Sequence, residues 1–248
     1  MFREHAPLDR PRAASDAGFR CIEMQFPYDL DRDALGKAIR DLGLTVSVIN
    51  VPADDLMTGG EGLAAVPGRE AEFRKAVETA ASYAEALGAI NVNVLAGAPG
   101  PEHARDACLE TLAGNLRHAA DRFATISVRT VVEPINTADR PGFLLPRVED
   151  AAALIGRTGR DDIFVQFDLY HVAMMQDPVV ATFEAHRAKV GHIQFADAPG
   201  RHEPGTAGID FQSAFAAIDG AGYSGWTAAE YFPAGRTEDG LGWFRASA

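Results

Sequence analysis

Short runs of β-branched and apolar residues alternate along the chain with longer stretches whose apolar positions recur at helical spacing. The predicted strands are residues 21–26, 45–50, 90–95, 129–134, 164–169, 190–195 and 226–231. The predicted helices are residues 8–17, 31–41, 69–87, 102–123, 148–155, 178–189 and 211–221. Such alternation is typical of a parallel α/β sheet. The pattern therefore predicts an α/β fold of the (β/α)8 TIM barrel type, formed by one domain over residues 1–248.

Local signals support several of these helices. In the third predicted helix Phe73 and Val77 lie on one apolar face that should pack against the barrel, and Gly88 is placed to end the helix. Asp177 and Asp210 directly precede later helices. Both are good N-cap residues, because a short carboxylate can accept a hydrogen bond from a free backbone N–H of the first turn.

The seven predicted strands are one fewer than a closed eight-stranded barrel needs. The missing strand should precede the first helix, where only seven residues of polar character stand. We therefore expect either that the sequence is truncated at its start or that the barrel has an open seam beside the first and last strands. Because unpaired strand edges favour pairing with another chain, a homo-oligomer is also expected.

The loops that follow the predicted strands are long and rich in Gly and Pro, whereas the reverse connections are short. The long loops are residues 51–68, 95–103, 133–146 and 196–210. In a barrel, the loops at the carboxyl ends of the strands build the active site. This asymmetry therefore predicts a substrate-binding face.

Composition and charge exclude several functional classes. The 248 residues are 47% hydrophobic and carry a formal net charge of −12, with a pI near 5.0. A nucleic-acid-binding surface would be basic, and an acidic balance also disfavours anionic membranes. Cys21 and Cys108 lack CxxC spacing, and the polar amino terminus is unlike a signal peptide. These features, with no apolar run long enough to span a membrane, predict a soluble cytoplasmic protein with free thiols.

Four metal-competent side chains stand at the ends of successive predicted strands: Glu133, Asp168, Gln194 and Glu230. Their spacings of 35, 26 and 36 residues each fit one strand, a crossover helix and a returning strand. A single carboxylate at a strand end is more often a helix cap or an ion-pair partner. Four of these groups in series, however, would converge on one face of a barrel, and three carboxylates with an amide suit Mg2+ or Mn2+.

Five stretches of the chain together resemble the hydroxypyruvate isomerase family, within the sugar isomerase and epimerase barrels related to xylose isomerase. They are EGLAAVPGREAEF, the LAG of NVNVLAG, VVEPINTADRPGFLL, QFDLYH and ADAPGRHEPGTAGIDF. The likeness spans nearly the whole chain, and EPIN, DLYH and GRHEPGT in this order are its specific motifs. The chain departs from the family at the missing first strand, at Val94, where relatives often have Cys, and in VAMMQDP after DLYH.

The resemblance implies roles for particular residues. It implies that the four strand-end groups are the metal-binding residues, and that Glu133 and Glu230 also form the pair of proton-transfer carboxylates. His171, three residues after Asp168, and Arg201 match positions expected to hold substrate oxygens. The implied reaction is the conversion of hydroxypyruvate to tartronate semialdehyde through an enediolate, with Mg2+ or Mn2+ as cofactor.

Further candidates for substrate contact are His202, beside Arg201 in the same loop, Asn93 in NVNVLAG and Glu61 on a mobile lid. Each has an ordinary structural interpretation: solvation for His202, a polar interior layer for Asn93 and a surface charge for Glu61. His192 alternates with Gln194 and should point to the same side of its strand. The other histidines, His5, His103, His118 and His186, are interpreted as structural.

Three alternative functions stay open. A 2-oxo-tetronate or sugar isomerase or epimerase could use the same ligands on longer substrates. A catalytically inactive barrel could serve as a binding protein, if the missing strand has disabled catalysis. A phosphodiester hydrolase of the apurinic-site endonuclease kind shares the barrel and metal chemistry, but the acidic charge and the lack of a His-rich ligand set disfavour it.

Overall fold

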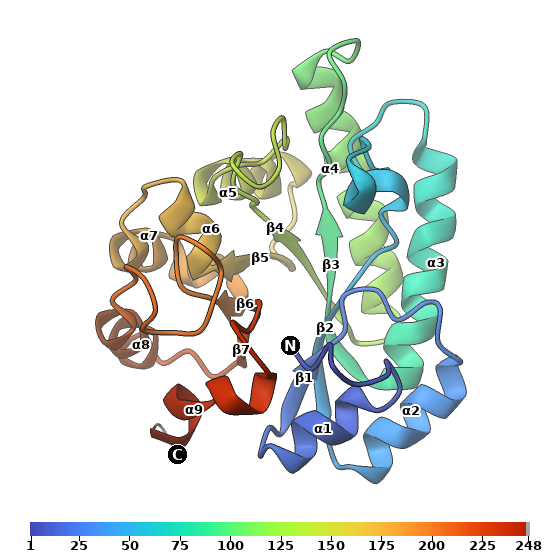
Figure 1. The fold of residues 1–248 in the computed structure, drawn as a ribbon. Helices are drawn as coiled ribbons and strands as arrows, with labels where there is room; N and C mark the ends of the chain where they lie inside the picture. Colours follow the sequence, from blue (N-terminus) through green and yellow to red (C-terminus); the bar gives the residue numbers. More distant parts are fainter. Residues whose placement is uncertain (247–248) are drawn as a thin grey trace.

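The seven apolar runs form seven parallel strands of one sheet, paired in chain order (Figure 1). The computed structural model describes residues 1–246. The strands are β1 Cys21–Glu23, β2 Thr45–Asn50, β3 Ala89–Leu95, β4 Arg129–Glu133, β5 Ile163–Asp168, β6 Val190–Phe195 and β7 Thr227–Ala229. The sheet curls into a nearly closed barrel with helices around it (Figure 1). The predicted α/β barrel with seven strands is thereby confirmed.

Nine α-helices and three short 3-10 helices connect or flank these strands in the described part of the chain. The α-helices are α1 Arg10–Asp16, α2 Arg32–Asp41, α3 Glu70–Leu87, α4 Arg105–Ala124, α5 Val148–Thr158, α6 Leu169–Met174, α7 Val179–His186, α8 Phe211–Gly220 and α9 Gly242–Ala246. The 3-10 helices are η1 Asp54–Thr58, η2 Arg187–Lys189 and η3 Thr237–Gly240. None of the helices within residues 1–246 is long and apolar enough to span a membrane.

The predicted helix signals are correct at two of three positions. Gly88 ends α3 in a left-handed conformation with a φ of 64°, which costs a glycine little. Asp210 caps α8 by accepting a hydrogen bond from the Ser213 N–H at 3.0 Å. The prediction that Asp177 caps a helix is wrong. Pro178 is the N-cap of α7, and the Asp177 carboxylate instead forms an ion pair with Arg147.

Some predicted element boundaries also change. The first and last strands have three residues each, shorter than the six predicted, and a register shift interrupts the pairing of β1 with β2 after Ile22. A helix that the sequence pattern did not indicate, α6, begins directly after β5. It begins there because the Asp168 carboxylate accepts the Tyr170 N–H at 2.9 Å and so provides the cap.

The two faces of the strands have opposite character. On the outer face, apolar residues such as Val92, Val165 and Phe167 pack against the helices in the main core. On the inner face, polar side chains occupy the alternate positions, including Asn91, Asn93, Gln166, Asp168, His192 and Gln194, and all of these are buried. Because side chains alternate across a strand, one sequence supplies an apolar outer layer and a polar interior.

Side chains, rather than a strand ladder, join the two edges of the sheet. Within residues 1–246, β1 and β7 form no ladder with each other. Glu23 at the end of β1 accepts a hydrogen bond from Gln194 of β6 at 2.9 Å. Outside the seam, the ring of Phe19 stacks on that of Phe244 in α9 at 4.3 Å. The amino- and carboxyl-terminal segments therefore lie side by side at this edge (Figure 1).

Candidate active site

The four predicted metal-ligand positions lie at the carboxyl ends of adjacent strands. Glu133 is the last residue of β4, Asp168 is the last of β5, and Gln194 is the penultimate residue of β6. Asp168 and Gln194 are direct partners in the strand register. Glu230 follows β7, and its N–H donates to the Phe195 carbonyl at 2.9 Å, which extends the pairing by one residue. The fold therefore carries all four side chains to one end of the barrel.

Contacts between side chains show that the three carboxylates converge. His171 Nε2 lies 3.7 Å from Glu133 Oε1 and 3.6 Å from Asp168 Oδ2. One ligand atom from each of these three residues lies within 4.8 Å of the others. Arg201 Nη2 donates to Asp168 Oδ2 at 3.0 Å and to Glu230 Oε2 at 2.6 Å. A single small volume is thus bordered by three acids, an imidazole and a guanidinium.

Burial and mutual repulsion make these carboxylates hard to ionise together. Burial raises the pKa of Glu133 well above its ordinary value, and the charges of Glu230 and Asp168 raise it further. Burial likewise raises the pKa of Asp168, and it raises that of Glu230 to about 7 even though the Arg201 charge opposes the shift. Buried carboxylates with this repulsion favour a nearby cation. The donor set of three acids and the Gln194 amide fits a divalent cation that prefers oxygen ligands.

The imidazole of His171 is neutral, and its tautomer is set by Asn136. Burial lowers the His171 pKa well below 6.5, and the Arg201 charge adds to this effect. Asn136 Oδ1 accepts the N–H groups of Ala138 and Asp139, so its Nδ2 is the atom that faces His171 Nδ1, at 2.7 Å. Since that contact makes Nδ1 the acceptor, the proton is on Nε2. His171 therefore points an N–H donor at the space between the acids.

The other ring nitrogen of His171, Nε2, lies close to the Arg201 guanidinium. Arg201 Nη1 lies 3.3 Å from His171 Nε2. A neutral imidazole has only one acceptor nitrogen, and the shorter contact from Asn136 assigns that role to Nδ1. The approach of Nη1 to Nε2 therefore brings two donors together. A ligand oxygen that accepted from both groups would relieve it.

The loop that carries Arg201 is held by one buried aspartate. Asp197 follows β6 and accepts four backbone N–H groups of the loop, from Ala198, Gly205, Ala207 and Ile209. Arg201 itself has a φ of 55°, and its N–H donates to the Asp197 carbonyl. Its guanidinium lies over the Tyr170 ring, 4.8 Å from the centroid. The loop conformation therefore aims Arg201 at the acids.

Of the remaining predicted residues, only Asn93 joins the cluster. Asn93 Nδ2 donates to Glu133 Oε2 at 2.8 Å and to Asn50 Oδ1 at 3.1 Å, so it holds the Glu133 carboxylate. Its Oδ1 is buried and has no hydrogen-bond partner among the described residues.

Glu61 and His202 lie apart from the cluster. Glu61 accepts the Gly100 N–H and ties two loops together. His202 is exposed and contacts the Phe232 carbonyl through Nδ1 at 2.7 Å. Substrate contact by either residue stays a prediction.

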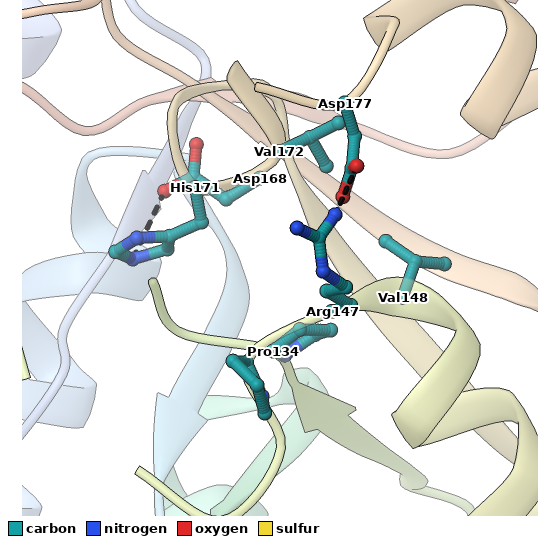
Figure 2. Close-up of a pocket in the computed structure, with 8 residues that line it drawn as sticks. Pro134, Arg147, Val148, Asp168, His171, Val172 and Asp177 are labelled. Carbon is teal, nitrogen blue, oxygen red and sulfur yellow. Dashed lines mark hydrogen bonds and ion pairs between the residues drawn. The ribbon is translucent and has the colours of Figure 1, made fainter. Parts of the chain in front are cut away.

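A small pocket lies beside the acids (Figure 2). Asp168 and His171 border it on one side, and the ion pair of Arg147 with Asp177 borders it on the other (Figure 2). The ion pair of Asp177 with Arg147, which replaces the predicted helix cap, therefore lines the pocket next to the acids.

Comparison with known proteins agrees with the fold. The xylose isomerase-like TIM barrel model matches residues 11–247. The chain belongs to this family. A 2-oxo-tetronate isomerase of Cupriavidus necator is 39% identical over 245 residues, which cover 99% of this chain and 94% of that protein. A hydroxypyruvate isomerase of Escherichia coli is 38% identical over 243 residues, which cover 98% of this chain and 94% of that protein.

A solved structure from Brucella melitensis, described as an AP endonuclease of family 2, superimposes with a TM-score of 0.95. The two sequences are 37% identical, and the superposition covers 99% of this chain and 95% of the Brucella melitensis chain. The family resemblance inferred from the loop motifs is thus confirmed, as is the prediction of a hydroxypyruvate isomerase-like enzyme within the family.

Sequence reasoning did not identify three residues that support the site. Asn136 is the last residue of the EPIN motif, and Asp197 lies at the start of the GRHEPG loop, so the motifs contained both without indicating their roles. Glu23 ends β1 as Glu133 ends β4. In the predicted first strand, residues 21–26, Glu23 is an interior position, so the strand-end pattern does not indicate it.

Proposed function

We propose that this protein is a divalent-cation-dependent isomerase of 2-oxo-3-hydroxy acids, and that it interconverts hydroxypyruvate and tartronate semialdehyde. The observation that carries the proposal is the pairing of two carboxylates, the buried Glu133 and the half-buried Glu230, with a neutral N–H donor from His171 and the Arg201 guanidinium. Burial raises the pKa of both carboxylates, that of Glu230 to about 7, and general acid–base catalysis needs groups whose pKa lies near the working pH.

The proposed reaction moves a proton between adjacent carbons. A carboxylate of Glu133 or Glu230 takes the proton from the hydroxymethyl carbon of hydroxypyruvate. The electrons of that C–H bond form the carbon–carbon double bond of an enediolate, while the π electrons of the carbonyl move onto its oxygen. The proton then returns to the neighbouring carbon, while the hydroxyl proton passes to the oxygen of that carbon. Two carboxylates allow the base and the acid to be different residues. The Nε2–H of His171 can donate to an oxygen on which negative charge develops.

Glu133, Asp168, Gln194 and Glu230 would hold the cation, Mg2+ or Mn2+. When bound, it would stabilise the negative charge that develops on the substrate oxygens, an effect worth several kcal/mol in comparable sites. Three carboxylates and one amide leave the site with a charge of roughly −3 before the ion is counted, so a 2+ ion also relieves the repulsion between the acids.

Arg201 would bind the substrate carboxylate. Its guanidinium is planar and can pair with two oxygens at once, and in the structure it already lies against two acids of the cluster. A 2-oxo-tetronate shares the carboxylate, the carbonyl and the adjacent hydroxyl with hydroxypyruvate and adds one hydroxymethyl group. It is the alternative substrate, and the two named relatives at 39% and 38% identity do not distinguish the two acids.

The test is turnover by chelator-stripped protein, checked for folding by circular dichroism, with and without added Mn2+ or Mg2+. Hydroxypyruvate and 2-oxo-tetronate are supplied in separate reactions, and products are followed by proton NMR. Metal-restored turnover of hydroxypyruvate supports the proposal, and a preference for the four-carbon acid selects the alternative. Folded protein that binds metal but converts neither acid would instead indicate an inactive barrel that acts as a binding protein.

The description of the Brucella melitensis structure makes a phosphodiester hydrolase the second candidate. The net charge of −12 opposes it, because binding to a DNA backbone depends on basic residues that neutralise phosphates. A duplex that contains one apurinic site, incubated with the metal-loaded protein, tests this candidate directly. We expect the duplex to stay intact under conditions in which hydroxypyruvate is consumed.

A further inference from the structure

A fourth acid, Glu23, lies next to the proposed ligands, and among the described contacts it is hydrogen-bonded to one of them, Gln194. Glu23 Oε2 accepts a hydrogen bond from Gln194 Nε2 at 2.9 Å. Glu23 Oε1 accepts one from His192 Nε2. The Glu23 side chain is only 9% exposed. Both carboxylate oxygens are therefore occupied by donors on β6, across the seam between the two edges of the sheet.

An amide ligand has a problem that a carboxylate ligand lacks. One end of the Gln194 side chain is an oxygen that can bind a cation, and the other is an NH2 group that cannot. The two orientations of the amide have nearly the same shape, so packing alone does not choose between them. Only hydrogen-bond partners of fixed polarity can make one orientation more stable than the other.

Glu23 has that fixed polarity. An ionised carboxylate only accepts hydrogen bonds, so it draws the NH2 group of Gln194 toward β1 and leaves the oxygen on the opposite side. There, Gln194 Oε1 accepts from Gln166 Nε2 at 2.6 Å. A carbonyl oxygen has two lone pairs and can therefore accept that hydrogen bond and still bind a cation.

We infer that Glu23 is a positioning residue that fixes the Gln194 amide with its oxygen toward the cation site. His192 supports this role, because its Nε2–H holds the second oxygen of Glu23. The inference rests on the proposed function, since it assumes that Gln194 binds the cation. Replacing a residue that hydrogen-bonds to a metal ligand and orients it commonly weakens metal affinity by about 10- to 100-fold.

The test is Mn2+ affinity, measured on chelator-stripped protein by isothermal titration calorimetry and by the electron paramagnetic resonance signal of free Mn2+. In Glu23→Gln, residue 23 can donate as well as accept, so Gln194 can turn its NH2 group toward the cation. We expect about 10- to 100-fold weaker Mn2+ binding with an unchanged thermal unfolding midpoint. Glu78→Gln is the matched control, because Glu78 is exposed, pairs only with Arg122 in the described contacts and lies outside the barrel.

A double variant separates positioning from a merely structural role. In Glu23→Gln combined with Gln194→Glu, the ligand has oxygens at both ends, and residue 23 can donate to it while still accepting from His192. The number of charges and hydrogen bonds is the same as in the wild type. We expect the Mn2+ affinity of the double variant to be no more than about threefold weaker than that of the wild type. Repair of general packing would not produce this recovery.

The outcomes distinguish the two proposals. Wild-type protein that does not bind Mn2+ would overturn the cation site and with it this inference. If the wild-type protein binds Mn2+, two results would overturn only the role of Glu23. One is a Glu23→Gln variant that binds Mn2+ as tightly as the wild type, and the other is a double variant that binds it no more tightly than Glu23→Gln. If Glu23→Gln does not fold, Glu23→Asp takes its place. The shorter carboxylate should not reach Gln194, so unchanged Mn2+ affinity in that variant would overturn the inference.

Discussion

The loop that delivers Arg201 depends on Asp197, and replacing this residue with Asn isolates its contribution. Oδ1 of Asp197 accepts the N–H groups of Ala198 at 2.9 Å and Ile209 at 3.0 Å. Oδ2 accepts those of Gly205 at 2.9 Å and Ala207 at 2.8 Å. The residue is fully buried. Asn has the same shape, but it presents one oxygen and one NH2 group, so two of the four N–H groups would face a donor.

The magnitude follows from those two lost acceptors. A buried donor left without a partner costs about 1–3 kcal/mol, so Asp197→Asn should lower the free energy of unfolding by about 2–6 kcal/mol. Domains are stable by only about 5–15 kcal/mol, so this is a large fraction of the total. If the loop detaches without unfolding the barrel, Arg201 will no longer be held at the site, and the KM for hydroxypyruvate will rise.

Urea unfolding followed by circular dichroism measures the first effect, and Asp210→Asn is the control. Asp210 is an exposed N-cap that accepts from Ser213, and Asn caps helices equally well, so we expect a change within about 0.5 kcal/mol. Equal unfolding midpoints and equal KM values for the two variants would refute the reasoning.

The pH dependence supplies a second check on Asp197. Burial alone would raise its pKa, but the backbone N–H groups of Ile209, Ala207, Ala198 and Gly205 outweigh burial and hold the pKa below 3.8. A lowered folded-state pKa gives stability that is present above the unfolded value and is lost as the pH falls through the folded value. The difference between wild type and Asp197→Asn should therefore be constant above about pH 5 and should shrink in acid.

Three further predictions concern the acids and the imidazole. Glu133→Gln and Glu230→Gln should each reduce metal-dependent kcat by about 10²- to 10⁴-fold, and normal turnover in both would contradict their proton-transfer role. Because the Glu230 pKa is about 7, the folded metal-free protein keeps a proton that the unfolded chain releases near pH 4.5, so the free energy of unfolding should fall as the pH rises from about 4.5 through 7. Mn2+ affinity should rise over the same interval, because the bound ion displaces that proton. Calorimetric titrations in buffers of different ionisation enthalpy would detect the released protons, and an affinity independent of pH would refute the shift. Asn136→Ala should release the His171 tautomer and lower kcat by about tenfold, with a change in the 15N shifts of the His171 ring that a purely structural effect would not cause.

The sequence predicts the ends of β4, β5 and β6 to within one residue, because each of these strands is a short run rich in β-branched and apolar residues that is followed by a polar loop. Glu133, Asp168, Gln194 and Glu230 stand out where such runs stop, and parallel pairing forces those ends to meet at one edge of the barrel. The convergence of the four groups could therefore be anticipated from spacing alone. The resemblance to the family added the roles, which the apolar pattern does not contain.

Residues whose role depends on a distant partner could not be identified in this way. Asp177 is placed correctly for a cap, but Arg147 lies close in space and offers an ion pair that the local pattern does not show. Glu23 ends a three-residue strand with irregular pairing, and its two donors come from the far side of the seam, about 170 residues later in the chain. Long-range contacts of this kind are set by barrel closure.

The polar interior of the barrel links stability to the proposed activity. Glu133, Asp168 and Glu230 lie close together, and desolvation and repulsion raise their pKa values and so disfavour their charged forms. The fold tolerates them because the oxygens are largely met by donors: Asn93 at Glu133, the Tyr170 N–H at Asp168, and Arg201 between two acids. These donors orient the acids, and the positive charge of Arg201 offsets only one of the negative charges. The negative charge that remains would attract a cation. The Glu230 pKa of about 7 would let this residue take up and release a proton near neutral pH, so the repulsion that lowers stability is also what the proposed chemistry needs.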